Sequence, residues 1–197
     1  VSDWSSDVCS SDLTKEVEIT DRLCEAVLLT MIKETPRAIK EPDNYHARAN
    51  IMWAGTVAHN DIVGVGREGD WNSHTIEHEL SGLYDCAHGA GLAVIMPSWM
   101  EFVYKHDIMR FAQLAVRVWG CEMNFQNPEL TAYEGIQRFR HFLSSIGMPI
   151  NFEQIGAKKE DIPLLIEKQG ISDGWGFVPL DKDAVYQIYM NAVNAKI

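Results

Sequence analysis

Three histidines most strongly constrain how this chain can fold. His74, His78 and His88 lie in the segment 71–88, and they are three of the seven histidines in the chain. His74 and His78 are four residues apart, so on a helix they share one face. His74 and His88 cannot meet on one straight helix, because fourteen residues at about 1.5 Å each separate them by roughly 21 Å.

The chain must turn back if these imidazoles are to meet. A helix that ends at Tyr84 rises about 15 Å, and the extended segment 85–88 can recover about 14 Å. A helix, a short return and a second helix would therefore aim both rings at one point. Imidazole is a common protein ligand for divalent transition metals, so the spacing permits a metal site. The same spacing also fits surface or core histidines of an all-helical protein.

Nearby side chains fit both interpretations. Glu77 and Asp85 could accept a hydrogen bond from a ring N–H, or lie on a solvated helix face. Cys86 could be a soft ligand or a small buried filler. The aromatic side chains that could line a substrate pocket, or simply fill the core, are Trp53, Trp71 and Phe177.

Helical periodicity covers most of the chain, and no run alternates convincingly as a strand. Thr20 is a candidate N-cap, Pro36 is expected to end or kink the first helix, and Asn44 offers a new cap. We expect loops at 62–70 and 170–179. The pattern predicts roughly seven to nine helices in one all-α unit without a linker. The expected helices are 20–33, 47–59, 74–84, 90–104, 107–119, 131–146, 159–169 and 181–193.

Composition limits the classes of partner. The net charge is −11, which argues against nucleic acid and anionic membranes. No run of 18 apolar residues is present, so a transmembrane helix is not expected. The four cysteines form no CxxC pair, which favours reduced thiols and a cytoplasmic location.

The first 13 residues, VSDWSSDVCSSDL, differ from the rest of the chain. They show no helical or strand periodicity, and they resemble the translation of a sequencing-library adapter. We therefore predict a disordered, non-native leader at 1–13 and an α-helical domain at 14–197. It follows that the natural protein was cut at about residue 14, and that an unknown length is missing upstream.

Three segments carry a resemblance to a known family. They are TDRLCEAVL at 20–28, NYHARANIMWAGTVAHN at 44–60 and HTIEHELSGLYDCAHGAGLAVIMPSWM at 74–100. The last contains an H-x3-H-x9-H frame followed by G-x-G-L-A. On these segments, residues 14–197 resemble the C-terminal helical domain of iron-containing (type III) alcohol dehydrogenases, closest to the butanol dehydrogenase-like branch. The fold this implies is all-α and dehydroquinate synthase-like.

The resemblance implies a metal site and a nicotinamide cofactor. In that family one aspartate and three histidines bind the metal, and an N-terminal α/β domain binds NAD(P)(H). The last two ligands correspond to His74 and His88, while His78 matches a histidine beside the substrate and nicotinamide. The upstream aspartate–histidine pair and the nucleotide domain are missing here. The implied metal is Fe2+, with Zn2+ possible.

The activity implied is hydride transfer between NAD(P)(H) and a primary alcohol or aldehyde such as butanol or butanal. The branch suggests NADP(H), with NAD(H) open, and the full-length parent could be a homodimer. We expect the present chain to be inactive alone, because two ligands and the nucleotide site are missing.

Two other functions stay open. HTIEH also fits the H-x-x-E-H motif of inverted zinc peptidases, in which Glu77 would activate water. That interpretation leaves His88 unexplained and needs a downstream carboxylate ligand, for which Glu134 is a guess. The other is a non-catalytic helical interaction module.

Overall fold

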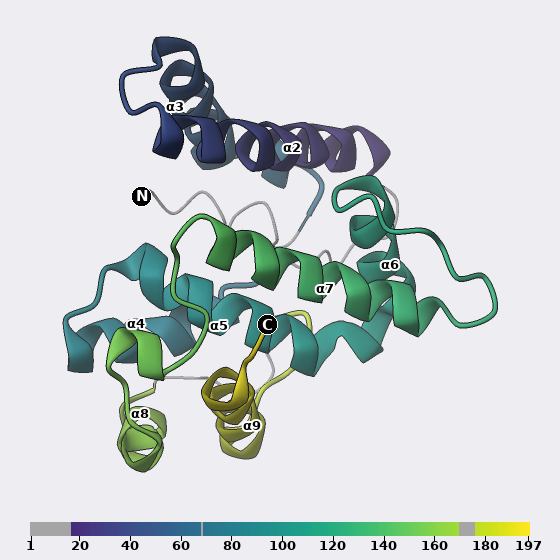
Figure 1. Cartoon of the computed structure of the whole chain (residues 1–197). Coiled ribbons are helices and arrows are strands. Elements are labelled where there is room, and N and C mark those ends of the chain that lie inside the picture. Colours follow the sequence, from purple (N-terminus) through teal and green to yellow (C-terminus); the bar gives the residue numbers. More distant parts are fainter. Residues whose placement is uncertain (1–16, 68, 170–175) are drawn as a thin grey trace. The chain divides into compact units, whose positions relative to one another are not determined.

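The computed structural model describes residues 17–67, 69–169 and 176–197 (Figure 1). Within these ranges the chain forms helices and no β-strand, which confirms the all-α prediction. The predicted leader and residues 170–175 of the predicted loop lie outside the described residues. The α-helices are α2 (Glu18–Lys40), α3 (Tyr45–His59), α4 (Asn72–Tyr84), α5 (His88–Val103), α6 (Ile108–Arg117), α7 (Pro128–Ser145), α8 (Ile162–Lys168) and α9 (Lys182–Asn194).

The helices divide into two compact units, and the boundary in the sequence falls between Asp70 and Trp71. The first unit contains α2 and α3, which pack against each other. The second contains α4 to α9. The boundary carries no proline-rich or low-complexity signal, so the sequence offers no sign of this division.

The first helix differs from its prediction at both ends. The N-cap of α2 is Val17 instead of Thr20, because the Thr20 hydroxyl donates to the Val65 carbonyl at 2.8 Å. The helix also continues past Pro36 to Lys40. A proline removes one backbone N–H, but the final turn has other support. The Arg37 guanidinium donates to the buried Glu34 carboxylate at 2.7 Å.

Side-chain caps fix the N-termini of three other helices close to where they are predicted. Asn44 caps α3, and its side-chain oxygen accepts from the Ala47 N–H at 3.1 Å. Asp107 and Asp181 cap α6 and α9 in the same way, each through its carboxylate. By contrast, α7 begins earlier than predicted, because Pro128 occupies its first turn, where the missing N–H costs nothing.

The core of the second unit is built around α5. Apart from His88 and Glu101, this helix carries no ionisable side chain, and Leu92, Val94 and Ile95 are fully buried. Helices α4, α7 and α9 pack against it. A helix that is apolar on all sides needs neighbours on several sides, which is what this arrangement provides. No helix in the described ranges is long and apolar enough to cross a membrane.

Helices α6 and α7 approach each other closely at Gly135. A Cβ atom added there would lie 2.9 Å from Ala115 Cα, much closer than ordinary contact. We therefore expect Gly135→Ala to lower the free energy of unfolding by about 1–3 kcal/mol through overpacking. Urea denaturation of the chain measures this.

Gly82→Ala is the matched control. Gly82 lies in α4, and a Cβ added there meets nothing within 4 Å. Alanine is a better helix former than glycine, so the free energy of unfolding of this variant should rise by about 0.5–1 kcal/mol. Equal effects of the two substitutions would contradict the close approach at Gly135.

Candidate metal centre

The predicted helix, return and second helix are confirmed. The helix α4 ends at Tyr84, and Asp85 follows in the left-handed conformation with φ 51°. The N–H of Asp85 donates to the Ser81 carbonyl at 3.0 Å and closes the last turn. His88 is then the first residue of α5, so the return is one residue shorter than expected.

This geometry brings the three histidines together. The ring centroids of His74 and His88 are 5.3 Å apart, and those of His78 and His88 are 5.1 Å apart. The distance between His74 and His78 is 6.2 Å. Their exposure differs: His74 is buried, His88 is half-buried and His78 is exposed.

Glu77 lies beneath this cluster and is completely buried. One carboxylate oxygen accepts a hydrogen bond from the Ser81 hydroxyl, and the other contacts Nδ1 of His88. Burial raises the pKa of Glu77, and the hydrogen bond from Ser81 and the nearby His88 oppose that rise. An Nδ1–H that donates to the carboxylate leaves the Nε2 lone pair of His88 available to a metal.

Two further contacts hold this part of α4 in place. Gly91 of α5 faces Glu77, and a Cβ added at Gly91 would lie 2.7 Å from Glu77 Cγ. On α9, the hydroxyl of the buried Tyr189 donates to the Ile76 carbonyl at 2.8 Å. Burial strongly raises the pKa of Tyr189, so it remains a neutral donor.

The donor set suits a divalent metal. Glu77, His78 and His88 each offer one potential ligand atom, and these atoms all lie within 4.8 Å of one another. Imidazole and carboxylate donors bind Fe2+ and Zn2+ alike, so the residues fit either ion without choosing between them. His74 is outside that group of three, although its ring is nearly as close to His88 as the ring of His78 is.

Other residues near the cluster take different roles from those considered in the sequence. Asp85 is exposed and ends α4. Cys86 is half-buried, and burial raises the pKa of its thiol, which disfavours the thiolate that binds metals. Cys86 and Cys121 are free thiols, and the Cys24 thiol donates to the Val63 carbonyl at 3.5 Å.

The three aromatic side chains considered for a substrate pocket lie in three different environments. Trp71 lies beside the cluster, with its ring 4.9 Å from that of His74. Phe177 is buried, and its ring lies 6.3 Å from that of Phe111, so it belongs to the core. Trp53 is 67% exposed on α3 in the first unit.

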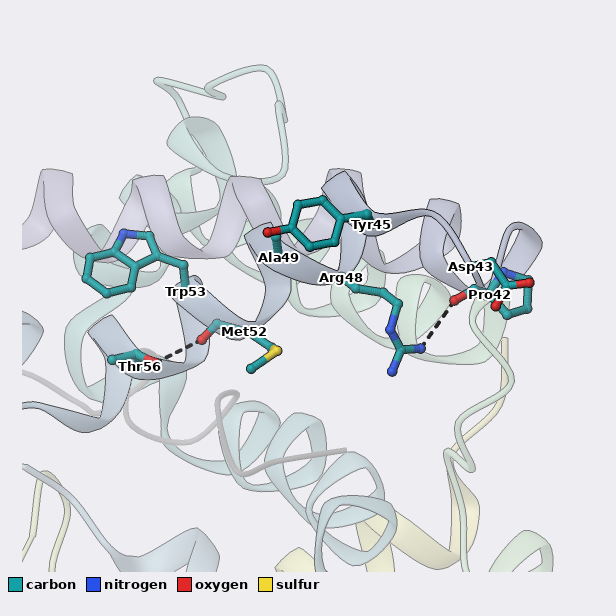
Figure 2. A pocket seen from close by; sticks show the side chains of 8 residues that line it. All are labelled: Pro42, Asp43, Tyr45, Arg48, Ala49, Met52, Trp53 and Thr56. Carbon is teal, nitrogen blue, oxygen red and sulfur yellow. Dashed lines mark hydrogen bonds between the residues drawn. The ribbon is translucent and has the colours of Figure 1, made fainter.

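Trp53 helps to line an open pocket of about 800 Å³ on the outer face of α3 (Figure 2). Arg48 reaches along this face and donates to the Pro42 carbonyl at 3.3 Å. The lining side chains include none of the residues of the candidate metal centre. They are Pro42, Asp43, Tyr45, Arg48, Ala49, Met52, Trp53 and Thr56.

The all-helical fold is the one that the resemblance implied, and the three histidines meet where their spacing predicted a return between two helices. The family model "Fe-containing alcohol dehydrogenase family, C-terminal" matches residues 13–193. The chain therefore belongs to the iron-containing alcohol dehydrogenase family and corresponds to its C-terminal part.

Individual relatives support this membership. The chain is 35% identical to NADH-dependent butanol dehydrogenase A of Clostridium acetobutylicum over 87% of its own length and 45% of that protein. It is 37% identical to the NADPH-dependent aldehyde reductase YqhD of Escherichia coli, over 79% of its own length and 40% of that protein.

A solved structure agrees. NADH-dependent butanol dehydrogenase A from Thermotoga maritima superposes with a TM-score of 0.90 at 32% identity, over 98% of this chain and 50% of that one. The chain thus spans about half the length of the relatives that it matches.

Sequence reasoning missed Ser81, Gly91 and Tyr189. A signal existed for Ser81, because it follows Glu77 by four residues and so shares its helix face. Gly91 stands in the G-x-G-L-A run, but nothing local says which side chain it faces. Tyr189 is 113 residues from Ile76, so no local pattern could have paired them.

Proposed function

We propose that this chain supplies the metal-binding half of an NAD(P)(H)-dependent alcohol dehydrogenase or aldehyde reductase. The observation that carries the proposal is the convergence of His74, His78 and His88 over the buried Glu77 carboxylate. Family membership supports oxidoreductase chemistry, and a location in the cytoplasm is part of the proposal. A homodimer of the full-length parent also stays a proposal.

His74 and His88 are the proposed metal ligands, and His78 is the proposed catalytic residue beside substrate and nicotinamide. Ring distances alone do not separate the two roles, because both rings lie just over 5 Å from His88. Exposure favours this assignment. His74 is buried, as suits a residue fixed on an ion, whereas His78 is exposed and can meet a substrate.

The metal, Fe2+ or Zn2+, would supply Lewis acidity toward the carbonyl or alcohol oxygen. Glu77 accepts the Nδ1–H of His88 and fixes its ring orientation. In the reductive direction a bound nicotinamide would supply hydride to the carbonyl carbon, and a ring nitrogen of His78 would deliver the proton that the oxygen accepts.

The proposal leaves the choice between NADH and NADPH open. The branch resemblance suggested NADP(H), yet the names of the relatives include both an NADH-dependent butanol dehydrogenase and an NADPH-dependent aldehyde reductase. We therefore propose a nicotinamide cofactor without a preference, and small primary alcohols and aldehydes such as butanol and butanal as substrates.

The peptidase alternative receives no support from the geometry. An H-x-x-E-H peptidase needs its glutamate beside a metal-bound water. Glu77 is completely buried, and its two oxygens contact Ser81 and His88. The guessed ligand Glu134 instead forms an exposed ion pair with Arg138 on α7.

The test is nicotinamide oxidation with butanal by the full-length protein that carries these residues. We expect activity that a chelator removes and that Fe2+ or Zn2+ restores. The 197-residue chain alone is expected to be inactive in the same assay. A full-length protein without nicotinamide-dependent activity, or with activity that survives complete metal removal, would contradict the proposal.

A further inference from the structure

We propose that Ser81 and Gly91 are positioning residues, which hold the Glu77 carboxylate against Nδ1 of His88 so that His88 presents Nε2 to a divalent cation. This inference rests on the proposed metal role of His88. It goes beyond that role because it assigns the orientation of the ligand to two residues that do not touch the ion.

Ser81 uses its hydroxyl on a side chain instead of on the backbone of its own helix. A helical serine commonly donates its hydroxyl to the backbone carbonyl four residues earlier. Ser81 donates instead to the Glu77 side chain, also four residues earlier. Because Glu77 is completely buried, its Oε1 atom takes this hydrogen bond from Ser81 and not from bulk water. Without the hydroxyl, rotation of the carboxylate would no longer be restrained on the Oε1 side.

The Glu77 side chain occupies the space that a Cβ atom at residue 91 would need. A Cβ added to Gly91 would lie 2.7 Å from Cγ and 2.8 Å from Cδ of Glu77. These atoms belong to a buried side chain that is held at both oxygens, so it cannot move aside cheaply. Gly91 therefore leaves room for Glu77 at the place where its Oε2 atom meets His88.

The contact with Glu77 also restricts the imidazole of His88. A histidine ring that donates Nδ1–H to a carboxylate is held in the tautomer whose Nε2 carries the lone pair. Glu77 lies on α4 and His88 on α5, so this contact sets the ring orientation across the return between the helices. Ser81 and Gly91 approach the same carboxylate from these two helices.

The test uses the 197-residue chain and histidine side-chain 1H–15N correlation spectra at about pH 8, where imidazole is ordinarily neutral. In the wild-type chain we expect His88 as the Nδ1–H tautomer. We expect Ser81→Ala and Gly91→Ala to convert His88 to a mixture of tautomers, and Ser81→Thr to restore the wild-type signal because it keeps the hydroxyl.

A second readout is Zn2+ affinity, measured by chelator competition on the same variants. Loss of a residue that orients a ligand typically weakens binding about 10–100-fold. We expect losses in that range for Ser81→Ala and Gly91→Ala. Two matched controls should leave both readouts unchanged: Gly82→Ala, which meets nothing, and Ser98→Ala, whose buried hydroxyl bonds its own helix at Val94.

The outcomes separate this inference from the proposed function. An unchanged His88 tautomer in Ser81→Ala overturns the positioning role, whatever the metal does. If Gly91→Ala fails to fold, Ser81→Ala and Ser81→Thr still decide the question. If the wild-type chain binds no Zn2+ while the tautomer responds as expected, the positioning role stands and the proposed metal site loses its support.

Discussion

Replacing His88 with alanine is expected to weaken Zn2+ binding by this chain by about two orders of magnitude or more. Complete zinc sites of four ligands are worth about 10–16 kcal/mol, or roughly 2.5–4 kcal/mol for each ligand, and His88 is one of the two proposed ligands that this chain contains. Each 1.4 kcal/mol corresponds to a tenfold change in affinity. His88 is central to the cluster, because the rings of both other histidines lie within 5.3 Å of it.

The matched control is His141→Ala, which removes an imidazole of the same unit. His141 is exposed on α7, and its Nδ1 atom lies 2.9 Å from the carbonyl of Gln137 in its own helix. Chelator competition should give the wild-type affinity for this variant. Similar losses for His88→Ala and His141→Ala would show that Zn2+ binds non-specifically, and they would count against the candidate metal centre.

The second large effect is expected at the ion pair between α5 and α7. The guanidinium of Arg140, with 3% of its side chain exposed, donates to both oxygens of Glu101 at 2.5 and 3.0 Å. Gln137 donates to the same carboxylate at 2.8 Å. Glu101→Ala leaves the buried guanidinium without its counter-charge. We therefore expect this substitution to lower the free energy of unfolding by about 3–5 kcal/mol.

The matched comparison is Glu134→Ala. This residue pairs with Arg138 at 2.6 Å, but both side chains are about half exposed, at 46% and 45%. Glu134→Ala should lower the free energy of unfolding by only about 0.3–0.5 kcal/mol, because water screens the ion pair. Urea denaturation of both variants measures the difference. Equal destabilisation would mean that burial does not control the strength of the Glu101–Arg140 pair.

Much of the helical framework could be predicted because its signals are local. Asn44, Asp107 and Asp181 each cap a helix through an N–H three residues ahead, so the sequence contains both partners side by side. The return between α4 and α5 was predictable for the same reason. It involves only a few residues after Tyr84, and the spacing of His74 and His88 needs a turn there.

The errors arose where a distant partner competes with a local role. Thr20 has the chemistry of an N-cap, but its hydroxyl bonds a carbonyl 45 residues away. The neighbouring Asp21 pairs with Arg67, which lies two residues after Val65. A cap is decided within one helical turn, whereas these contacts depend on how α2 packs against the segment at 62–67.

The sequence by itself thus determined the helical class, most helix ends and the family to which the histidine frame belongs. Only the tertiary structure decided which groups surround those histidines. Glu77 is buried, and Gly91 leaves room for it against His88, because α4 and α5 pack face to face. Burial and packing are properties of two helices together, so no periodicity within either one could specify them.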